Sequence, residues 1–244
     1  MQNMDDISTR ILLLGESAGS ARYLTGTFTH GGFPFRHVES SQTLDRLDEP
    51  FDVVMLSDYP AHRLSDVAQQ EIVRRVEDGA GLLMVGGWTS FTGKGGNYGE
   101  SRLAPLLPVV CGTGDDRRNV HSGMWFEAVE RDHPILHGLD IDNPPVLCGY
   151  NAVTVSPDAT LVAQGRMVAC CGGVATLGDA VPLLATRTVG KGRSVAYTSD
   201  LVPHWCGGIV DWGMQRVALP SGSEVSNCYV AFLTNMLRWA AGQG

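Results

Sequence analysis

The sequence predicts an α/β fold: a doubly wound, mostly parallel sheet with helices on both faces. Short runs of consecutive apolar residues recur in the first third of the chain, as expected of strands that are buried on both faces. Segments with helical periodicity lie between these runs, and glycine or serine–aspartate turns end them. Strands that alternate with helices in this way are typical of a parallel sheet.

The elements of the first half follow from these runs and from their caps. Strands are predicted over residues 11–14, 35–38, 51–56 and 82–85. A first helix is predicted over residues 18–30, because a glycine pair follows it. Ser65 can cap a second helix, whose apolar residues repeat about every 3.6 positions until Gly79.

The second half is less regular, and we expect one domain over residues 1–244 with an irregular excursion at about 109–180. Short helical and extended segments are both predicted there. Strands are expected at residues 151–155, 160–164, 167–171, 183–189 and 193–198, and helices at 101–107 and 224–241. The glycine-containing turn before residue 193 predicts a hairpin between the last two strands.

Composition excludes several classes of protein. A chain of 244 residues with 43% hydrophobic residues can bury a sizeable core. The net charge of −8 and the absence of a basic run argue against nucleic acid as a partner, and no apolar run is long enough to cross a membrane. The N-terminus lacks the basic and apolar regions of a signal peptide, so we expect a cytoplasmic protein with six reduced cysteines. No CxxC motif occurs, and we expect neither a metal nor a cofactor.

A glycine-rich loop follows the apolar run at residues 82–85. It begins with the sharp turn Gly86-Gly87-Trp88 and continues to Gly99. Several hydrolase families mount their nucleophile on such a strand–turn–helix elbow. Here the elbow carries a tryptophan and no cysteine, and Ser90 comes two residues later.

Polar and aromatic side chains follow several of the predicted strands. Because the carboxyl ends of parallel strands meet at one edge, we expect these side chains to share a crevice there. The candidates are Glu16, Ser17, Asp58, Trp88, Ser90, Asp200, His204 and Trp205, and also Tyr150 and Asn151. Each has a simpler explanation, since Asp200 can cap a turn, His204 and Trp205 can pack in the core, and Trp88 can cover the sheet end.

The chain resembles a known family in several of these segments. They are Gly15-Glu16-Ser17, the segment 81–91, Leu147-Cys148-Gly149-Tyr150-Asn151, Gly190-Lys191-Gly192-Arg193 and the segment from Ser199 to Trp205. The resemblance is to the glutamine-amidotransferase-like proteins, which have a class I glutamine amidotransferase-like fold and are more distantly ThuA-like. It runs over nearly the whole chain and implies a flavodoxin-like α/β fold.

The amidotransferase activity does not follow from this resemblance. That chemistry needs a cysteine at the elbow, activated by a histidine that a carboxylate orients. Trp88 lies at the elbow, His204 follows a late strand as the family histidine does, and Cys206 stands where an acidic residue is usual. We therefore predict a protein without glutaminase chemistry.

The leading hypothesis is that the crevice binds a small polar, sugar-like metabolite. Trp88, Tyr150 and Trp205 would stack on it, while acidic and amide side chains would bind its hydroxyl groups. Three alternatives stay open: a hydrolase or isomerase that uses His204 and Asp200 as acid and base, a non-catalytic homo-oligomeric or regulatory module, and a glutaminase that uses Cys148 or Cys206.

Overall fold

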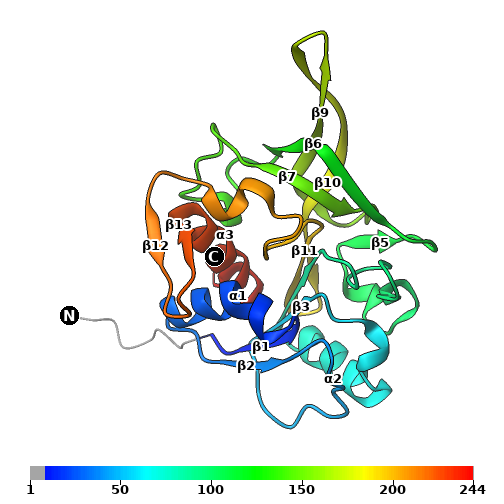
Figure 1. Ribbon diagram of the computed structural model, residues 1–244. Helices are drawn as coiled ribbons and strands as arrows, with labels where there is room; N and C mark the ends of the chain where they lie inside the picture. The colour runs from blue at the N-terminus through cyan, green and yellow to red at the C-terminus, as the bar shows by residue number, and fades with distance from the viewer. Residues whose placement is uncertain (1–8, 244) are drawn as a thin grey trace.

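The computed structural model describes residues 9–243, and within them nine strands form one mixed sheet (Figure 1). The strand order is β2-β1-β3-β4-β11-β10-β9-β6-β7. The strands are β1 (Ile11–Gly15), β2 (Phe35–Val38), β3 (Val53–Ser57), β4 (Gly81–Val85), β6 (Arg117–Ala128), β7 (Val146–Asn151), β9 (Thr160–Cys171), β10 (Val174–Val189) and β11 (Gly192–Tyr197). The predicted lack of a signal peptide concerns a terminus that lies largely outside the described residues.

Half of the sheet is parallel, as the apolar runs predict. Strands β2, β1, β3, β4 and β11 pair in parallel, with Leu12 opposite Val54 and Val54 opposite Leu82. Alternate residues of each strand face opposite sides, so Leu13 and Leu12 belong to two separate cores. The order 2-1-3-4, with β11 as the fifth strand, is that of flavodoxin-like sheets.

Helices cover both faces of the parallel half, as predicted. Helix α1 (Ala18–His30) and helix α3 (Asn227–Ala240) pack on one face through side chains such as Phe28 and Phe232, while α2 (Asp66–Glu77) packs on the other through Ile72. The hydroxyls of Ser17, Ser65 and Ser226 cap the three helices by accepting a backbone N–H in the first turn.

The other half of the sheet is antiparallel, which corrects the prediction of a mostly parallel sheet. Strands β11, β10, β9, β6 and β7 pair by antiparallel ladders, of which the β10–β11 hairpin was the predicted one. The predicted strands at 160–164 and 167–171 are one continuous strand, β9. Strands β9 and β10 extend beyond the sheet as an arm at the top of Figure 1. The apolar runs in β6 and β7 are short because exposed residues interrupt the buried ones there.

Two predicted helices are shorter than expected. Residues 101–107 hold only a 3₁₀ turn, because Pro105 has no N–H to continue a helix. Residues 224–226 form a strand before α3 begins. The remaining elements are β5 (Val109–Cys111), β8 (Val153–Val155), β12 (Arg216–Ala218), β13 (Glu224–Ser226) and the 3₁₀ helices η1 (Ala61–Arg63), η2 (Tyr98–Glu100), η3 (Ala104–Leu106), η4 (Pro134–Leu136) and η5 (Gly207–Asp211). No helix within residues 9–243 is long and apolar enough to cross a membrane.

Candidate functional site

Two acidic residues flank the point where the strand order of the parallel sheet reverses. Glu16 follows β1 directly and Asp58 follows β3 directly, and these two strands are neighbours. Ligands of doubly wound sheets bind at this place, outside the carboxyl ends of the strands. Both residues have a left-handed backbone, with φ of 56° and 50°. Such strain in residues other than glycine is concentrated at functional sites.

The carboxyl groups of Glu16, Asp58 and Asp200 interact with one another. Glu16 is 5% exposed and Asp200 is 1% exposed. Burial, and next the charge of Asp58, raise the pKa of Glu16 to about 8, although the Ser57 hydroxyl donates to Glu16 Oε1 at 2.7 Å. Burial also raises the pKa of Asp58, and burial with the charge of Glu16 raises the pKa of Asp200 well above its ordinary value.

No arginine or lysine in the described part of the chain forms an ion pair with any of these three groups, which we call the acidic cluster. The Val202 N–H donates to Asp200 Oδ1 at 2.9 Å, but Asp200 Oδ2 is buried without a hydrogen-bond partner. Buried acids usually have a partner, because desolvation of an unpaired charge is costly. The cluster therefore holds protons near neutral pH when nothing is bound.

The elbow after β4 has no backbone N–H left for a ligand. The Gly86 N–H donates to two carbonyl oxygens at 2.7 and 2.9 Å, and the Gly87 N–H donates to Asn151 Oδ1 at 2.9 Å. The N–H groups of Trp88 and Thr89 both point to the Asp58 carboxylate, with the Thr89 bond at 2.7 Å. An amidotransferase needs such groups free to stabilise an oxyanion.

The elbow also lacks space for a nucleophile at its two glycines. A Cβ atom at Gly86 would lie 2.2 Å from the carbonyl oxygen of Thr198, and a Cβ atom at Gly87 would lie 2.3 Å from Asp58 Oδ1. Both distances are far below van der Waals contact. The elbow is thus packed around the Asp58 carboxylate, and the next residue is Trp88.

A buried pair from the antiparallel half holds the glycine-rich loop in place. The Asn151 amide donates to the Gly87 carbonyl at 3.1 Å and to Asp116 Oδ1 at 2.8 Å. Asp116 also accepts the N–H groups of Thr92 and Gly93 at 3.0 and 2.8 Å. Both polar ends of the Asn151 side chain are engaged, so its role here is to position the elbow.

Near the Asp58 carboxyl group lie two exposed rings, Trp88 and His204, and the half-buried guanidinium of Arg117. Trp88 is 39% exposed, and its ring lies 5.0 Å from the ring of His204. The guanidinium of Arg117 lies over the Trp88 ring, 4.8 Å from its centre. Arg117 and His204 both interact electrostatically with the Asp58 carboxyl group. A planar ligand surface can stack on such rings.

The structure thus brings Glu16, Asp58, Trp88, Asp200 and His204 to one edge of the sheet. His204 interacts with Asp58, and no hydrogen bond joins it to Asp200 in the described residues. Whether any of them binds a ligand stays a prediction.

Five other predicted residues lie at the same edge with structural contacts. Ser90 is buried and accepts the Asp58 N–H at 3.1 Å, while Ser17 is exposed and caps α1. Trp205 is buried and donates to Asn119 Oδ1 at 2.7 Å, and Tyr150 is half-buried against the core. Asn151 forms, with Asp116, the buried pair described above that holds the glycine-rich loop.

Sequence reasoning missed Asp116 and Arg117. In the sequence, Asp116 and the two arginines that follow it are typical of a solvated surface segment. The signal that could have found these residues is an acid followed directly by two arginines at the start of an alternating strand, β6; the structure shows that the acid is buried.

The two cysteines of the third alternative differ in their surroundings. Cys206 is buried, and burial together with the charge of Asp200 raises its thiol pKa to about 12. Cys148 is exposed on β7. Within residues 9–243 no group of histidine, cysteine and acidic side chains could hold a metal ion.

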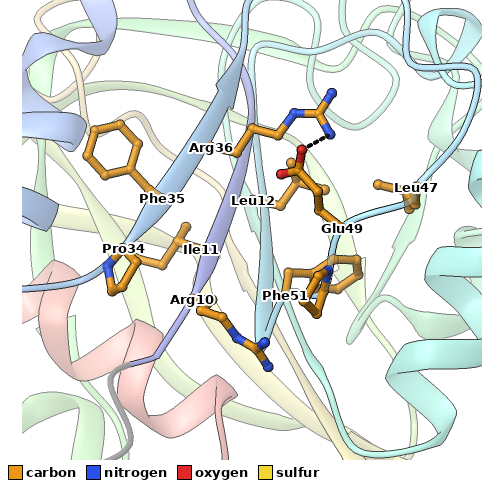
Figure 2. Close-up of a pocket in the computed structure, with 10 residues that line it drawn as sticks. Arg10, Ile11, Leu12, Pro34, Phe35, Arg36, Leu47, Glu49 and Phe51 are labelled. Carbon is orange, nitrogen blue, oxygen red and sulfur yellow. Dashed lines mark ion pairs between the residues drawn. The ribbon is translucent and has the colours of Figure 1, made fainter.

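A well-formed cavity lies elsewhere, at the amino ends of β1 and β2. It has a volume of about 190 Å³, and Figure 2 shows Phe35, Leu47 and Phe51 on its walls. Arg36 pairs with Glu49 at 3.7 Å beside it. This cavity contains none of the predicted site residues.

The family model described as "Putative glutamine amidotransferase" (GATase1_like) matches residues 16–218. The chain belongs to this family. No curated protein sequence matches the chain. The match begins at Glu16 and includes Asp58, Trp88, Asp200 and His204, so the whole edge described above lies inside the GATase1-like region.

Solved structures share the fold of this GATase1-like protein. Two cytoplasmic proteins of Salmonella typhimurium are each 24% identical with a TM-score of 0.75; they cover 94% and 95% of this chain, and the matches span 98% and 99% of their own lengths. A ThuA-like protein of Bacteroides uniformis is 12% identical with a TM-score of 0.55, over 95% of this chain and 91% of its own. At these identities the likeness establishes the fold alone.

Proposed function

We propose that this GATase1-like protein has no glutaminase activity and binds a small polar metabolite at the carboxyl edge of its sheet. The observation that carries the proposal is the position of the Asp58 carboxylate. It accepts the N–H groups of Trp88 and Thr89, where an amidotransferase elbow would receive an oxyanion. A carboxylate in that place blocks acyl chemistry and at the same time offers a negative charge to a ligand.

The surroundings of Asp58 support ligand binding. Trp88 and His204 are exposed beside it, and stacked rings above hydrogen-bonding groups are typical of sites for sugars and related metabolites. The position at the strand-order reversal supports the same conclusion. A cytoplasmic location is consistent with the Salmonella proteins of the same fold, and the acidic net charge favours a small-molecule partner over nucleic acid or membrane.

The glutaminase part is tested by ammonia release from glutamine. The wild type should stay at background, and so should Trp88→Cys, which places a thiol near the His204 ring but leaves the elbow N–H groups occupied. Turnover by Trp88→Cys would contradict the argument from the occupied N–H groups. Turnover by the wild type that disappears in Cys148→Ala or Cys206→Ala would establish the third alternative instead.

The binding part is tested by a thermal-shift screen of polyols, sugars and amides against the wild type and His204→Ala. Compounds that stabilise the wild type and are not converted support the proposal. Conversion by the wild type that falls about 10²- to 10⁴-fold in His204→Ala would favour acid–base catalysis. The electrostatic interaction of His204 with Asp58 favours Asp58 over Asp200 as the carboxylate partner in that alternative.

One observation favours an oligomeric module as a second candidate. The arm formed by β9 and β10 exposes Val174 at 63% and Leu177 at 49%, and Asp179 is its one charged residue between positions 167 and 181. Exposed apolar ribbons often pair with another chain. Light scattering after size-exclusion chromatography should detect a dimer that Leu177→Lys dissociates; a monomeric wild type removes this candidate.

A further inference from the structure

The acidic cluster has more negative charge than the fold needs. Asp58 already satisfies the elbow N–H groups, and Asp116 satisfies the glycine-rich loop. Glu16 and Asp200 do neither, yet both are more than nine-tenths removed from solvent and lie next to each other. Asp200 Oδ2 has no partner at all. An arrangement that leaves a buried acceptor unpaired is incomplete, and a hydrogen-bond donor from outside would complete it.

The donor that fits is a cation with several N–H groups. Beside burial, which is the larger cause, the charge of Asp58 raises the pKa of Glu16, and the charges of Glu16 and Asp58 raise the pKa of Asp200, so a positive ligand charge would relieve this repulsion. The described residues contain no cluster with the arrangement of a metal site. A protonated amine has three N–H donors on one atom, so it can donate to Asp200 Oδ2 and still have donors for a second acceptor.

The exposed rings make an organic amine a better fit than a bare ion. Trp88 and His204 are exposed and lie near Asp58, so a ligand whose charged end reaches Asp58 can place its body against their rings. Arg117 and His204 then face the part of the ligand that carries hydroxyl or anionic groups. Arg117 and the acidic cluster carry opposite charges, so an amine should bind with its nitrogen toward the acidic cluster.

We propose that the cluster of Glu16, Asp58 and Asp200 binds the protonated amine of a small organic molecule, and that the amine displaces a proton from the cluster when it binds. This inference rests on the proposed binding function and names the class of ligand. Proton balance is simple: the ammonium keeps its proton, a carboxyl group loses one to water, and no bond of the ligand changes.

The displaced proton makes binding depend on pH. With the Glu16 pKa at about 8, the empty cluster is protonated at pH 6, and the amine competes with that proton. Affinity for an amine should therefore rise about tenfold per pH unit from pH 6 toward pH 8, one proton being released per ligand bound. The titratable and charged groups that face the cluster from neighbouring elements are Tyr197, His204, Cys206, Tyr229 and Arg117.

The experiment compares amines with neutral analogues of the same shape. The probes are 2-aminoethyl glucoside against 2-hydroxyethyl glucoside, and ethanolamine against ethylene glycol, measured by calorimetry and thermal shift at pH 6 and pH 8, where both amines keep their proton. We expect each amine to bind at least tenfold more tightly than its neutral analogue at pH 8, with the advantage reduced about a hundredfold at pH 6. Proton release is counted with an indicator dye in weakly buffered solution.

Variants separate the cluster from the rest of the site. Asp200→Asn should lower amine affinity at least tenfold, and Asp48→Asn, a substitution at an exposed position, should leave it unchanged. Glu16→Gln serves the same purpose if Asp200→Asn does not fold. Neutral analogues that bind as tightly as amines would overturn this inference and leave the proposed function standing. If no probe binds at either pH, both proposals fail.

Discussion

At the amino ends of the parallel strands Asp52 and Glu49 each pair with an arginine, whereas at the carboxyl ends Glu16, Asp58 and Asp200 pair with none in the described residues. Arg10 donates to Asp52 through its backbone N–H and its guanidinium at 2.8 to 2.9 Å. These bonds lower the pKa of Asp52. Across the sheet, burial and mutual repulsion raise the pKa of Glu16 to about 8.

The difference shows why the presence of a cavity is a poor guide to the site in this protein. The cavity of Figure 2 lies at the end where the arginines are already neutralised, so its walls offer apolar contact and little unsatisfied polarity. The carboxyl end has strained backbone, unpaired acids and exposed rings. Uncompensated charge is what a ligand can still satisfy.

The largest effect is expected at Asp116, an acid of the carboxyl end whose oxygens are fully engaged. Asp116→Ala leaves the Thr92 and Gly93 N–H groups and the Asn151 amide without their acceptor, at a cost of about 3 kcal/mol of unfolding free energy. Urea denaturation measures it, with Asp48→Ala as the exposed control. A loss below about 1 kcal/mol would show that the hydrogen bonds of Asp116 are dispensable and that the acids at the two ends of the strands differ less than we infer.

The next largest effect on the unfolding free energy is expected for Glu16 at the carboxyl end and Asp52 at the amino end of the strands, with opposite signs. Above pH 4.5 the unfolded chain ionises Glu16 while the folded protein keeps its proton until about pH 8, so wild-type stability falls across this window. Glu16→Gln removes that loss and should be more stable than the wild type by roughly 1–3 kcal/mol at pH 8 and equal to it at pH 4.

Asp52→Asn should behave in the reverse way. The lowered pKa of Asp52 stabilises the fold above its ordinary value near 3.8, and this stabilisation is lost as the pH falls through the lowered pKa. The variant should be less stable by at most about 1 kcal/mol at pH 7, since the pair with Arg10 is partly exposed, and the difference should vanish in acid. Thermal unfolding of both variants from pH 3 to pH 8 checks the signs; equal signs would remove the contrast.

The smallest effect on stability is expected at Trp88. Because its ring is 39% exposed, Trp88→Ala should change the unfolding free energy by no more than about 0.5 kcal/mol. It should nevertheless weaken probe binding about tenfold, since the stacking surface is lost. Calorimetry with 2-aminoethyl glucoside measures the affinity. An equal loss of stability and affinity would mean that the ring supports the fold.

Much of this site follows from the sequence for a physical reason. Glu16 and Asp58 come directly after strands of the parallel half, and Asp200 comes three residues after another, so the parallel pairing brings these positions to the same edge whatever the details of packing. The antiparallel half is different. Asn151 is among the predicted candidates, whereas Asp116 and Arg117 reach the edge only through the pairing of β6 with β7, where Arg117 lies opposite Asn151. That register depends on contacts distant in sequence, and local periodicity does not encode it.

The carboxylate that fills the elbow also limits which residues this chain could accept there. Any side chain at Gly87 would place its Cβ atom 2.3 Å from Asp58 Oδ1, so the Asp58 side chain would have to move from its present position. The Thr89 N–H would then lose its acceptor. A larger residue at this glycine, next to Trp88, therefore comes at the expense of the charge that the present site uses.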